Sequence, residues 1–84
     1  MRYRVTIKKS ALKTLEKINE PFYTAIKAAL YSLEENPRPF GYVKLKGNKG
    51  YRIRVGDYRI IYEIHDNILL VNVINIGDRK EIYD

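Results

Sequence analysis

The sequence predicts an α+β domain in which a helical hairpin packs against a mainly antiparallel sheet, in the order β-α-α-β-β-β. Apolar residues recur at helical spacing between residues 11 and 35, whereas before and after that stretch they alternate or run together as in strands. The chain has 84 residues, which suffice for one small hydrophobic core but not for two. We therefore expect a single domain over residues 1–84, without internal repeats or linkers.

The N-terminal part of the chain predicts one strand and two helices. Residues 2–8 alternate between apolar and polar side chains, which is typical of a half-buried strand. Ser10 is expected to cap a short helix over residues 11–18. A second helix is expected over residues 21–35, because its apolar side chains form one stripe and the prolines after it end the helix. We interpret both apolar stripes as surfaces packed on the sheet rather than as a binding groove.

The C-terminal half predicts the rest of the sheet. Residues 43–47 are expected to form a short strand or extended segment. Gly56-Asp57 suits a tight two-residue turn, so residues 51–55 and 58–65 are expected to form a hairpin. Residues 68–76 are a nearly unbroken apolar run, which predicts a strand that is central in the sheet or covered on both faces.

The predicted hairpin gathers arginines. Within residues 51–55 the apolar side chains share one parity, while Arg52 and Arg54 share the other and are expected to point away from the core together. Arg59 lies near the start of the returning strand, so three guanidinium groups are expected on or beside one face of the sheet. No fold requires such a cluster, and it therefore indicates an anionic ligand.

The charge of the chain supports this interpretation. The formal net charge is +6 and the pI is near 9.6, which favours an acidic partner such as nucleic acid. Lys44, Lys46 and Lys49 extend the basic region on the N-terminal side of the arginines. The alternative is that these residues form an ordinary solvated basic face.

Several classes of protein are not expected from the composition. The chain has no cysteine and one histidine, so neither a disulfide framework nor a metal centre built on thiolates or histidines is expected. Its apolar runs fall short of the roughly 20 residues that a membrane-spanning helix needs, and the N-terminus lacks a signal-peptide core. We find no phosphate-binding or dinucleotide-binding glycine loop and expect no cofactor. A cytoplasmic location is expected.

The remaining arginine, lysine and tyrosine side chains suit the cleavage of RNA by its own 2′-hydroxyl group. Such an enzyme aligns the attack, stabilises the negative charge on the phosphorane, and supplies a proton acceptor and a proton donor. Arginine suits the second task because its planar fork binds two phosphate oxygens, but its pKa is too high for ready proton release. The candidates for proton transfer are Tyr83, His65, Lys46 and Asp78.

The chain resembles the RelE/ParE superfamily of toxins from type II toxin–antitoxin systems over essentially its full length. The resemblance rests on three segments, Val43-Lys44-Leu45-Lys46-Gly47, Tyr51-Arg52-Ile53-Arg54-Val55-Gly56-Asp57-Tyr58-Arg59-Ile60-Ile61-Tyr62 and Val73-Ile74-Asn75-Ile76-Gly77-Asp78-Arg79-Lys80-Glu81-Ile82-Tyr83. It implies the RelE-like microbial-ribonuclease fold and metal-independent cleavage of mRNA in the ribosomal A site. It also implies neutralisation by a cognate antitoxin, so the expected partners are that antitoxin, the ribosome and mRNA.

The resemblance also implies roles for individual residues. The implied catalytic residues are Arg52, Arg54, Arg59, Arg79 and Tyr83, with Tyr83 as a base or as the group that orients the attacking hydroxyl. Lys46 matches a basic residue near the substrate backbone, and with Lys44 and Lys49 it is expected to contact RNA or the ribosome. Arginine stands at positions 52 and 54 where relatives often carry lysine, and Asp78 precedes Arg79 where many carry histidine or a basic residue.

Two other functions remain open at this point. A ParE-like toxin that poisons DNA gyrase would share the middle segment, including Tyr58 and Arg59, but generally lacks the complete arginine and tyrosine set. A non-catalytic relative would keep the basic face only to bind nucleic acid or antitoxin.

Overall fold

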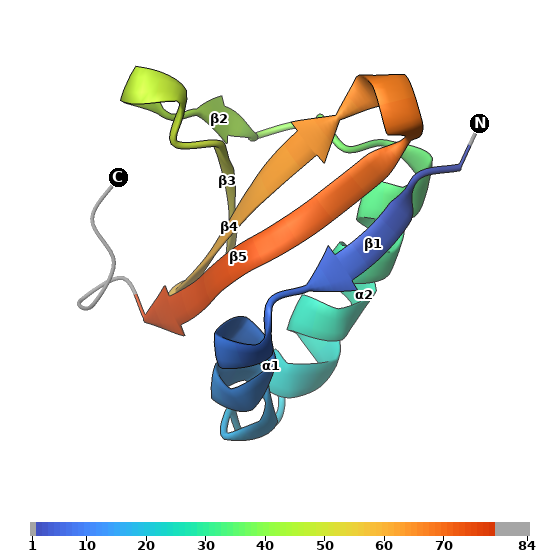
Figure 1. Cartoon of the computed structure of the whole chain (residues 1–84). Coiled ribbons are helices and arrows are strands. Elements are labelled where there is room, and N and C mark those ends of the chain that lie inside the picture. Colours follow the sequence, from blue (N-terminus) through green and yellow to red (C-terminus); the bar gives the residue numbers. More distant parts are fainter. Residues whose placement is uncertain (1, 79–84) are drawn as a thin grey trace.

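The computed structural model describes residues 2–78, which form one five-stranded sheet with two helices on one of its faces (Figure 1). The elements are β1 (Arg4–Ile7), α1 (Lys9–Glu16), α2 (Phe22–Glu35), β2 (Val43–Lys44), β3 (Tyr51–Val55), β4 (Tyr58–His65) and β5 (Leu70–Asp78). The predicted α+β class is confirmed. The segment expected to be a strand or extended chain after the helices contributes a strand of two residues.

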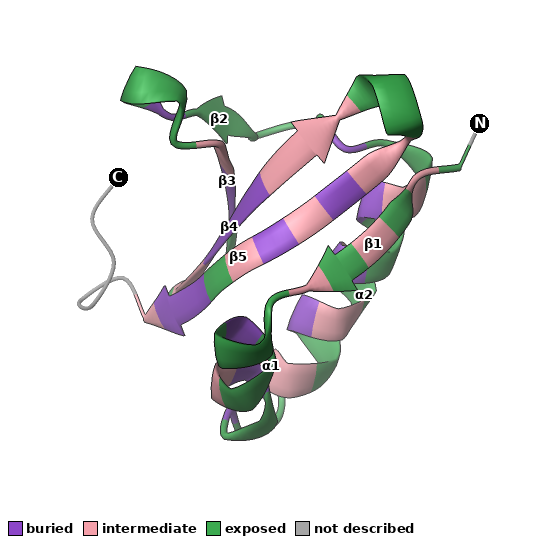
Figure 2. Ribbon diagram, in the orientation of Figure 1, coloured by how far each residue is buried: buried purple, intermediate pink, exposed green. Residues whose placement is uncertain are grey.

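The strands lie in the order β1-β5-β4-β3-β2. Only β1 and β5 are parallel among the described strands, and the other neighbours are antiparallel. As expected from its apolar run, β5 is an inner strand, and buried residues alternate along it (Figure 2). A register shift opposite Ile61 and Tyr62 leaves Ile74 between the paired residues Val73 and Asn75, and Ile74 packs on Ile61 and Leu45 on the face away from the helices, while Ile76 returns to the main core. β5 therefore has apolar contacts on both faces.

The main core lies between the helices and the sheet. Its fully buried side chains come from α2 and from the inner strands; the largest are Tyr62, Ile26, Leu33, Ile60, Ile76, Val71 and Val73. Burial of these apolar surfaces is the main force that holds the helices on the sheet. No helix in residues 2–78 is both long and apolar enough to cross a membrane.

The start of α1 differs from the sequence prediction. The helix begins at Lys9, Lys8 occupies the N-cap position without a side-chain hydrogen bond, and Ser10 lies inside the first turn. The amide of Lys8 donates to the carbonyl of Val73 at 2.8 Å, so Lys8 still belongs to the sheet. The end of the strand pairing, and not a side-chain cap, therefore sets the start of this helix.

The start of α2 is capped by a residue that precedes its proline. Pro21 occupies the N-cap position, and the Glu20 carboxylate accepts hydrogen bonds from the Thr24 amide at 2.9 Å and the Thr24 hydroxyl at 2.6 Å. These bonds hold the pKa of Glu20 below its usual value. The carboxylate also lies where the helix dipole favours negative charge.

Two turns shift strand boundaries from the predicted ones. The strand predicted at residues 43–47 ends earlier, and the strand predicted at residues 68–76 begins later. Lys46–Asn48 form a 3-10 turn in which Gly47 and Asn48 have positive φ values, which ends β2 at Lys44. A second 3-10 turn, Asp66–Ile68, is followed by Leu69 at φ 51°, so β5 starts only at Leu70. Positive φ values are incompatible with a continuing strand.

The predicted hairpin turn at Gly56-Asp57 is confirmed. Val55 pairs with Tyr58 across the turn, and Gly56 has a φ of +60°. A Cβ atom at position 56 would lie 2.5 Å from Cε1 of Phe22, so the turn packs closely on the start of α2. This contact fixes the hairpin relative to the helices.

A polar cluster, the Arg38 clasp, ties the far end of the sheet together. It consists of Tyr3, Arg38 and Asp66. The Arg38 guanidinium donates to both carboxylate oxygens of Asp66, at 3.2 and 2.9 Å, and the Tyr3 hydroxyl donates to the same carboxylate. Arg38 also stacks over the Tyr51 ring, 5.6 Å from its centroid. The clasp thus joins the start of β1, the segment after α2 and the β4–β5 turn.

Candidate functional site

The strand register brings the three hairpin arginines to one face of the sheet. Arg54 pairs with Arg59, and Arg52 pairs with Ile61. Residues opposite one another on antiparallel strands point to the same side, and so do residues two apart on one strand. Arg52, Arg54 and Arg59 therefore share the face that the helices do not cover, here called the arginine face.

The three arginines are buried to very different degrees. Arg52 is only 7% exposed, Arg59 is half-buried and Arg54 is exposed. A buried arginine is rare, because its charge must be compensated inside the protein. Arg52 was expected to point away from the core, and it does so, but the small apolar cluster of Leu45, Ile61 and Ile74 lies on the same face. Position 52 therefore contributes to the fold as well as to the charge of this face.

The Arg54–Arg59 pair is unfavourable on its own. Like charges that face one another on neighbouring strands destabilise a sheet. Both residues border a small hollow of about 40 Å³ at the turn, together with Gly56, Asp57 and Tyr58. Two guanidinium groups in this arrangement can hold the oxygens of one phosphate group.

The three lysines predicted to contact RNA lie together beside the arginines. Lys44, Lys46 and Lys49 border a hollow of about 430 Å³ with Val43 and Leu45. The strand that carries Lys44 pairs with β3, where Val43 lies opposite Arg52. Lys44 itself lies opposite Tyr51, which packs on the main core, so Lys44 points away from the arginine face and the lysines lie at the neighbouring edge of the sheet.

The proton-transfer candidates separate in space. His65 ends β4, and its Nε2 lies 3.2 Å from Oε1 of Glu63. Six residues of extended strand separate His65 from Arg59, a distance of about 20 Å, so His65 does not join the arginines. Asp78 ends β5 opposite Tyr58, next to the hairpin turn. Within residues 2–78, no three His, Cys, Asp or Glu side chains gather as a metal site would require.

Two of the predicted catalytic residues, Arg79 and Tyr83, lie outside the described residues. The same holds for the expected pairing of Asp78 with Arg79. The described part of the site therefore consists of Arg52, Arg54 and Arg59 with the neighbouring lysines.

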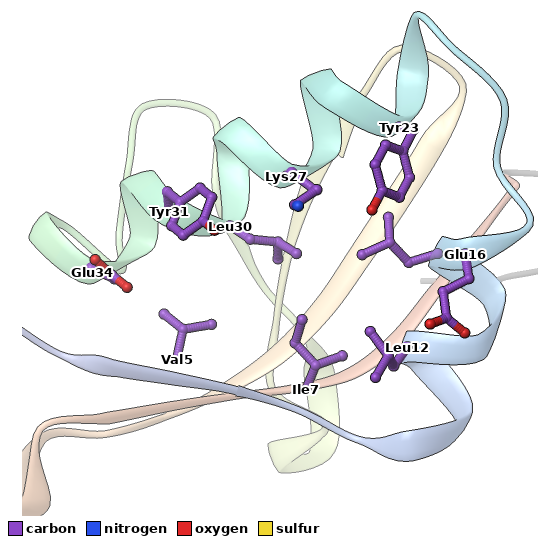
Figure 3. Close-up of a pocket in the computed structure, with 10 residues that line it drawn as sticks. Val5, Ile7, Leu12, Glu16, Tyr23, Lys27, Leu30, Tyr31 and Glu34 are labelled. Carbon is purple, nitrogen blue, oxygen red and sulfur yellow. The ribbon is translucent and has the colours of Figure 1, made fainter.

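A second surface was not expected from the sequence. An apolar groove of about 210 Å³ lies between β1, α1 and α2, and Figure 3 shows Val5, Ile7, Leu12 and Leu30 pointing into it. Leu12 is 40% exposed and Tyr31 is 62% exposed. The apolar stripes of the helices are predicted to pack on the sheet, and periodicity cannot tell a packed stripe from one that is partly open.

The groove has two further features that suit a protein partner. Its rim carries both signs of charge, with Glu16 and Glu34 beside Lys27. It also adjoins β1, which is an edge strand of the sheet and pairs only with β5 among the described strands. Open strand edges and apolar grooves are common docking sites for partner segments.

Comparison with known proteins identifies the family. A family model described as the ParE toxin of the type II toxin–antitoxin system parDE matches residues 5–83. A protein of Escherichia coli described as a RelE-like toxin is 27% identical over 89 aligned residues, which cover all of this chain and 93% of that protein.

Solved structures agree with these matches. The toxin in the archaeal RelE–RelB complex from Pyrococcus horikoshii superposes with a TM-score of 0.84 at 31% identity, covering 98% of this chain and 100% of the other. The intact E. coli RelBE toxin–antitoxin complex gives a TM-score of 0.78 at 29% identity, with 90% and 95% of the two chains covered. The chain therefore belongs to the RelE/ParE superfamily of toxins from type II toxin–antitoxin systems.

Proposed function

We propose that this toxin is an endoribonuclease that acts in the cytoplasm, cuts mRNA in the A site of the ribosome and so arrests translation. The observation that supports the proposal is the Arg54–Arg59 pair on a sheet face that also carries Arg52. Opposed guanidinium groups at an accessible hairpin end suit the charge that develops on a phosphate during strand cleavage. Arg79 and Tyr83 complete the proposed catalytic set.

The proposed reaction needs no group beyond the protein and the RNA. The 2′-hydroxyl oxygen of one nucleotide attacks the adjacent phosphorus and loses its proton to a base, for which Tyr83 is the proposed group. The bond from phosphorus to the 5′ oxygen of the next nucleotide breaks, and that oxygen takes up one proton for the one that the 2′ oxygen lost, so no proton is consumed overall. The products are a 2′,3′-cyclic phosphate and a 5′-hydroxyl end. Arg54 and Arg59 hold the phosphate oxygens, which carry most of the developing charge.

Primer extension on mRNA from a translating extract tests this proposal. We expect cuts at in-frame codon positions when the protein is added, and their loss when Arg54, Arg79 or Tyr83 is replaced. Arg4→Gln is the matched control, because Arg4 is an exposed arginine on β1, at the other edge of the sheet. Intact mRNA with the parent protein would contradict the proposal. RNA binding that weakens with salt but yields no cuts would indicate a non-catalytic relative.

Poisoning of DNA gyrase is the second candidate function. It is favoured by the match to a family model described as a ParE toxin. A supercoiling assay separates the two candidates, because a gyrase poison inhibits supercoiling and leaves the mRNA of the extract intact.

We further propose that the cognate antitoxin docks in the apolar groove between β1, α1 and α2. Relatives of this chain have been solved as RelE–RelB complexes, including an E. coli RelE variant bound to an antitoxin peptide. In this chain the groove offers exposed apolar side chains, mixed charge and an open strand edge together. A partner segment that orders on this surface would also raise the apparent stability of the toxin.

Co-expression with the antitoxin encoded by the adjacent gene tests the docking site. Tyr31→Glu places a charge in the groove and is expected to weaken neutralisation by about 10-fold or more in antitoxin dose, while growth arrest without antitoxin persists. Ile68→Glu is the control, because Ile68 is equally exposed, at 61%, but lies in the β4–β5 turn. Equal neutralisation of both variants would exclude this groove.

A further inference from the structure

The loop between α2 and β2 presents an aromatic ring to solvent. Phe40 is fully exposed, whereas Phe22, the other phenylalanine of the chain, packs against the core. A single exposed apolar side chain is common on protein surfaces and says little by itself. The position of Phe40 and the way in which its loop is held make it a candidate binding residue.

Phe40 lies beside the arginines of the candidate site. It borders a hollow of about 370 Å³ together with Pro39 and Gly41 of its own loop and Arg52, Ile53 and Arg54 of β3. Ala29 and Ser32 of α2 close the other side. Among the described residues β2 pairs only with Tyr51 and Arg52, so the outer edge of β3 stays open along this hollow. An aromatic ring and the exposed Arg54 thus share one open site, which the buried Arg52 also borders.

The loop holds Phe40 at the tip of a defined turn. The amide of Tyr42 donates to the carbonyl of Pro39 at 3.0 Å, and Gly41 has a φ of +90°, as the third position of a type II turn requires. Two anchors fix the preceding residues: the Tyr62 hydroxyl donates to the carbonyl of Pro37 at 2.7 Å, and Arg38 binds Asp66. The backbone that carries the ring is therefore ordered before any ligand binds, which lowers the entropy cost of binding.

We propose that Phe40 is a stacking platform for one base of a single-stranded RNA whose phosphate backbone lies on the exposed Arg54. The inference rests on the proposed function, in that RNA is the substrate. An aromatic face next to cationic side chains is the combination with which proteins bind single-stranded nucleic acids, because every base offers a flat apolar face and every linkage a negative charge. The nearby arginines disfavour an apolar or basic peptide as the occupant. Phe40 is thus a positioning residue that holds the codon while the arginines act on its phosphate.

Fluorescence gives a direct test, because the chain contains no tryptophan. In Phe40→Trp the new indole is the only one, and we expect a short 2′-O-methyl oligoadenylate, which cannot be cut, to quench it. Tyr31→Trp is the matched control: it places an indole at a site that is also exposed, at 62%, but in the apolar groove, and no quenching is expected. Binding detected by anisotropy of a labelled oligonucleotide, without quenching in Phe40→Trp, would overturn the proposal.

Cleavage in a translating extract provides the second test. We expect Phe40→Ala to raise the concentration of toxin needed for half-maximal cutting by about 10-fold, and Phe40→Tyr to restore it, because both aromatic rings stack. Equal cutting by Phe40→Ala and the parent would overturn the proposal and leave the proposed function intact. Quenching by the oligonucleotide without any cutting would support the stacking site and contradict the nuclease. A loss of neutralisation by antitoxin in Phe40→Ala, with cutting unchanged, would assign Phe40 to the protein interface instead.

Discussion

Arg38 and Arg54 show two different uses of the same side chain at two ends of the sheet. Arg38 makes two hydrogen bonds to Asp66 and stacks on the Tyr51 ring, and these contacts raise its pKa. Arg54 is exposed and lies across the strand pair from another arginine, Arg59. The first arrangement balances the charge of the arginine inside the fold, whereas the second sets two like charges against each other.

The difference indicates which arginines serve the fold and which serve a ligand. A bidentate pair with a carboxylate fixes geometry and joins distant segments of the chain, as the Arg38 clasp does. Guanidinium groups opposite one another repel, and an anion that binds between them reduces this repulsion. Stability and activity are therefore expected to respond to different arginines in this protein.

The largest expected effect is that mutations of Arg54 and Arg38 separate mRNA cutting from stability. Arg54→Gln is expected to lower mRNA cutting about 100-fold, since it removes a donor to the charged phosphate, and to change the free energy of unfolding by less than about 0.5 kcal/mol. Arg38→Gln is expected to do the reverse, with cutting within about 3-fold of the parent and a melting temperature lower by a few degrees. Thermal unfolding and primer extension on both variants measure the pattern. If both mRNA cutting and the melting temperature fell in both variants, the assignment of Arg38 to stability and Arg54 to activity would be refuted.

The sequence predicts the arginine face well because a strand has only two faces. The alternation of Arg52 and Arg54 with Ile53, followed by a two-residue turn, determines which side chains lie together whatever the rest of the fold. The burial of Arg52 could not be predicted in this way. It depends on Leu45, Ile61 and Ile74, which are distant in sequence, meeting on the same face.

The helices also show what the sequence cannot predict. Their apolar spacing predicts that they pack on a sheet, but it cannot show that Leu12 stays partly uncovered. That outcome depends on how the two helices pack over β1, which is a property of the folded chain. The N-terminus of α1 is comparable, because a hydrogen bond from Lys8 to Val73, distant in sequence, outweighs the local preference of Ser10 for a cap.

A smaller effect is expected at the buried hydroxyl that anchors the loop after α2. Tyr62 is fully buried, burial raises the pKa of its phenol, and its hydroxyl donates to the carbonyl of Pro37. Tyr62→Phe leaves that carbonyl without its donor and is expected to cost about 1 kcal/mol of unfolding free energy. Urea denaturation measures the loss, with Tyr31→Phe on the exposed side of α2 as the control. An unchanged transition midpoint in Tyr62→Phe would show that the loop does not depend on this bond.

The smallest effect is a pH dependence of the Arg38 clasp. Hydrogen bonds from Arg38 and then from Tyr3 lower the pKa of Asp66 to about 2 from its ordinary value of 3.8. A carboxylate with a lowered pKa stabilises the fold above the unfolded-state pKa, and this contribution is lost as the pH falls toward the folded-state value. The melting temperatures of the parent and Asp66→Asn are therefore expected to differ by a constant amount near neutral pH and to converge between about pH 4 and pH 2.

The cause of the shift can be tested in the same experiment. Because Arg38 is the main donor to Asp66, the difference between Arg38→Gln and Arg38→Gln/Asp66→Asn should be smaller than the difference that Asp66→Asn makes in the parent. The effect of Asp66→Asn on the melting temperature could instead have the same size, and disappear at the same pH, with and without Arg38. That result would mean that Arg38 does not hold the carboxylate in its charged form. The Arg38 clasp would then be a surface contact that does not stabilise the fold. Arg38 and Arg54 would in that case differ only in where they lie on the sheet.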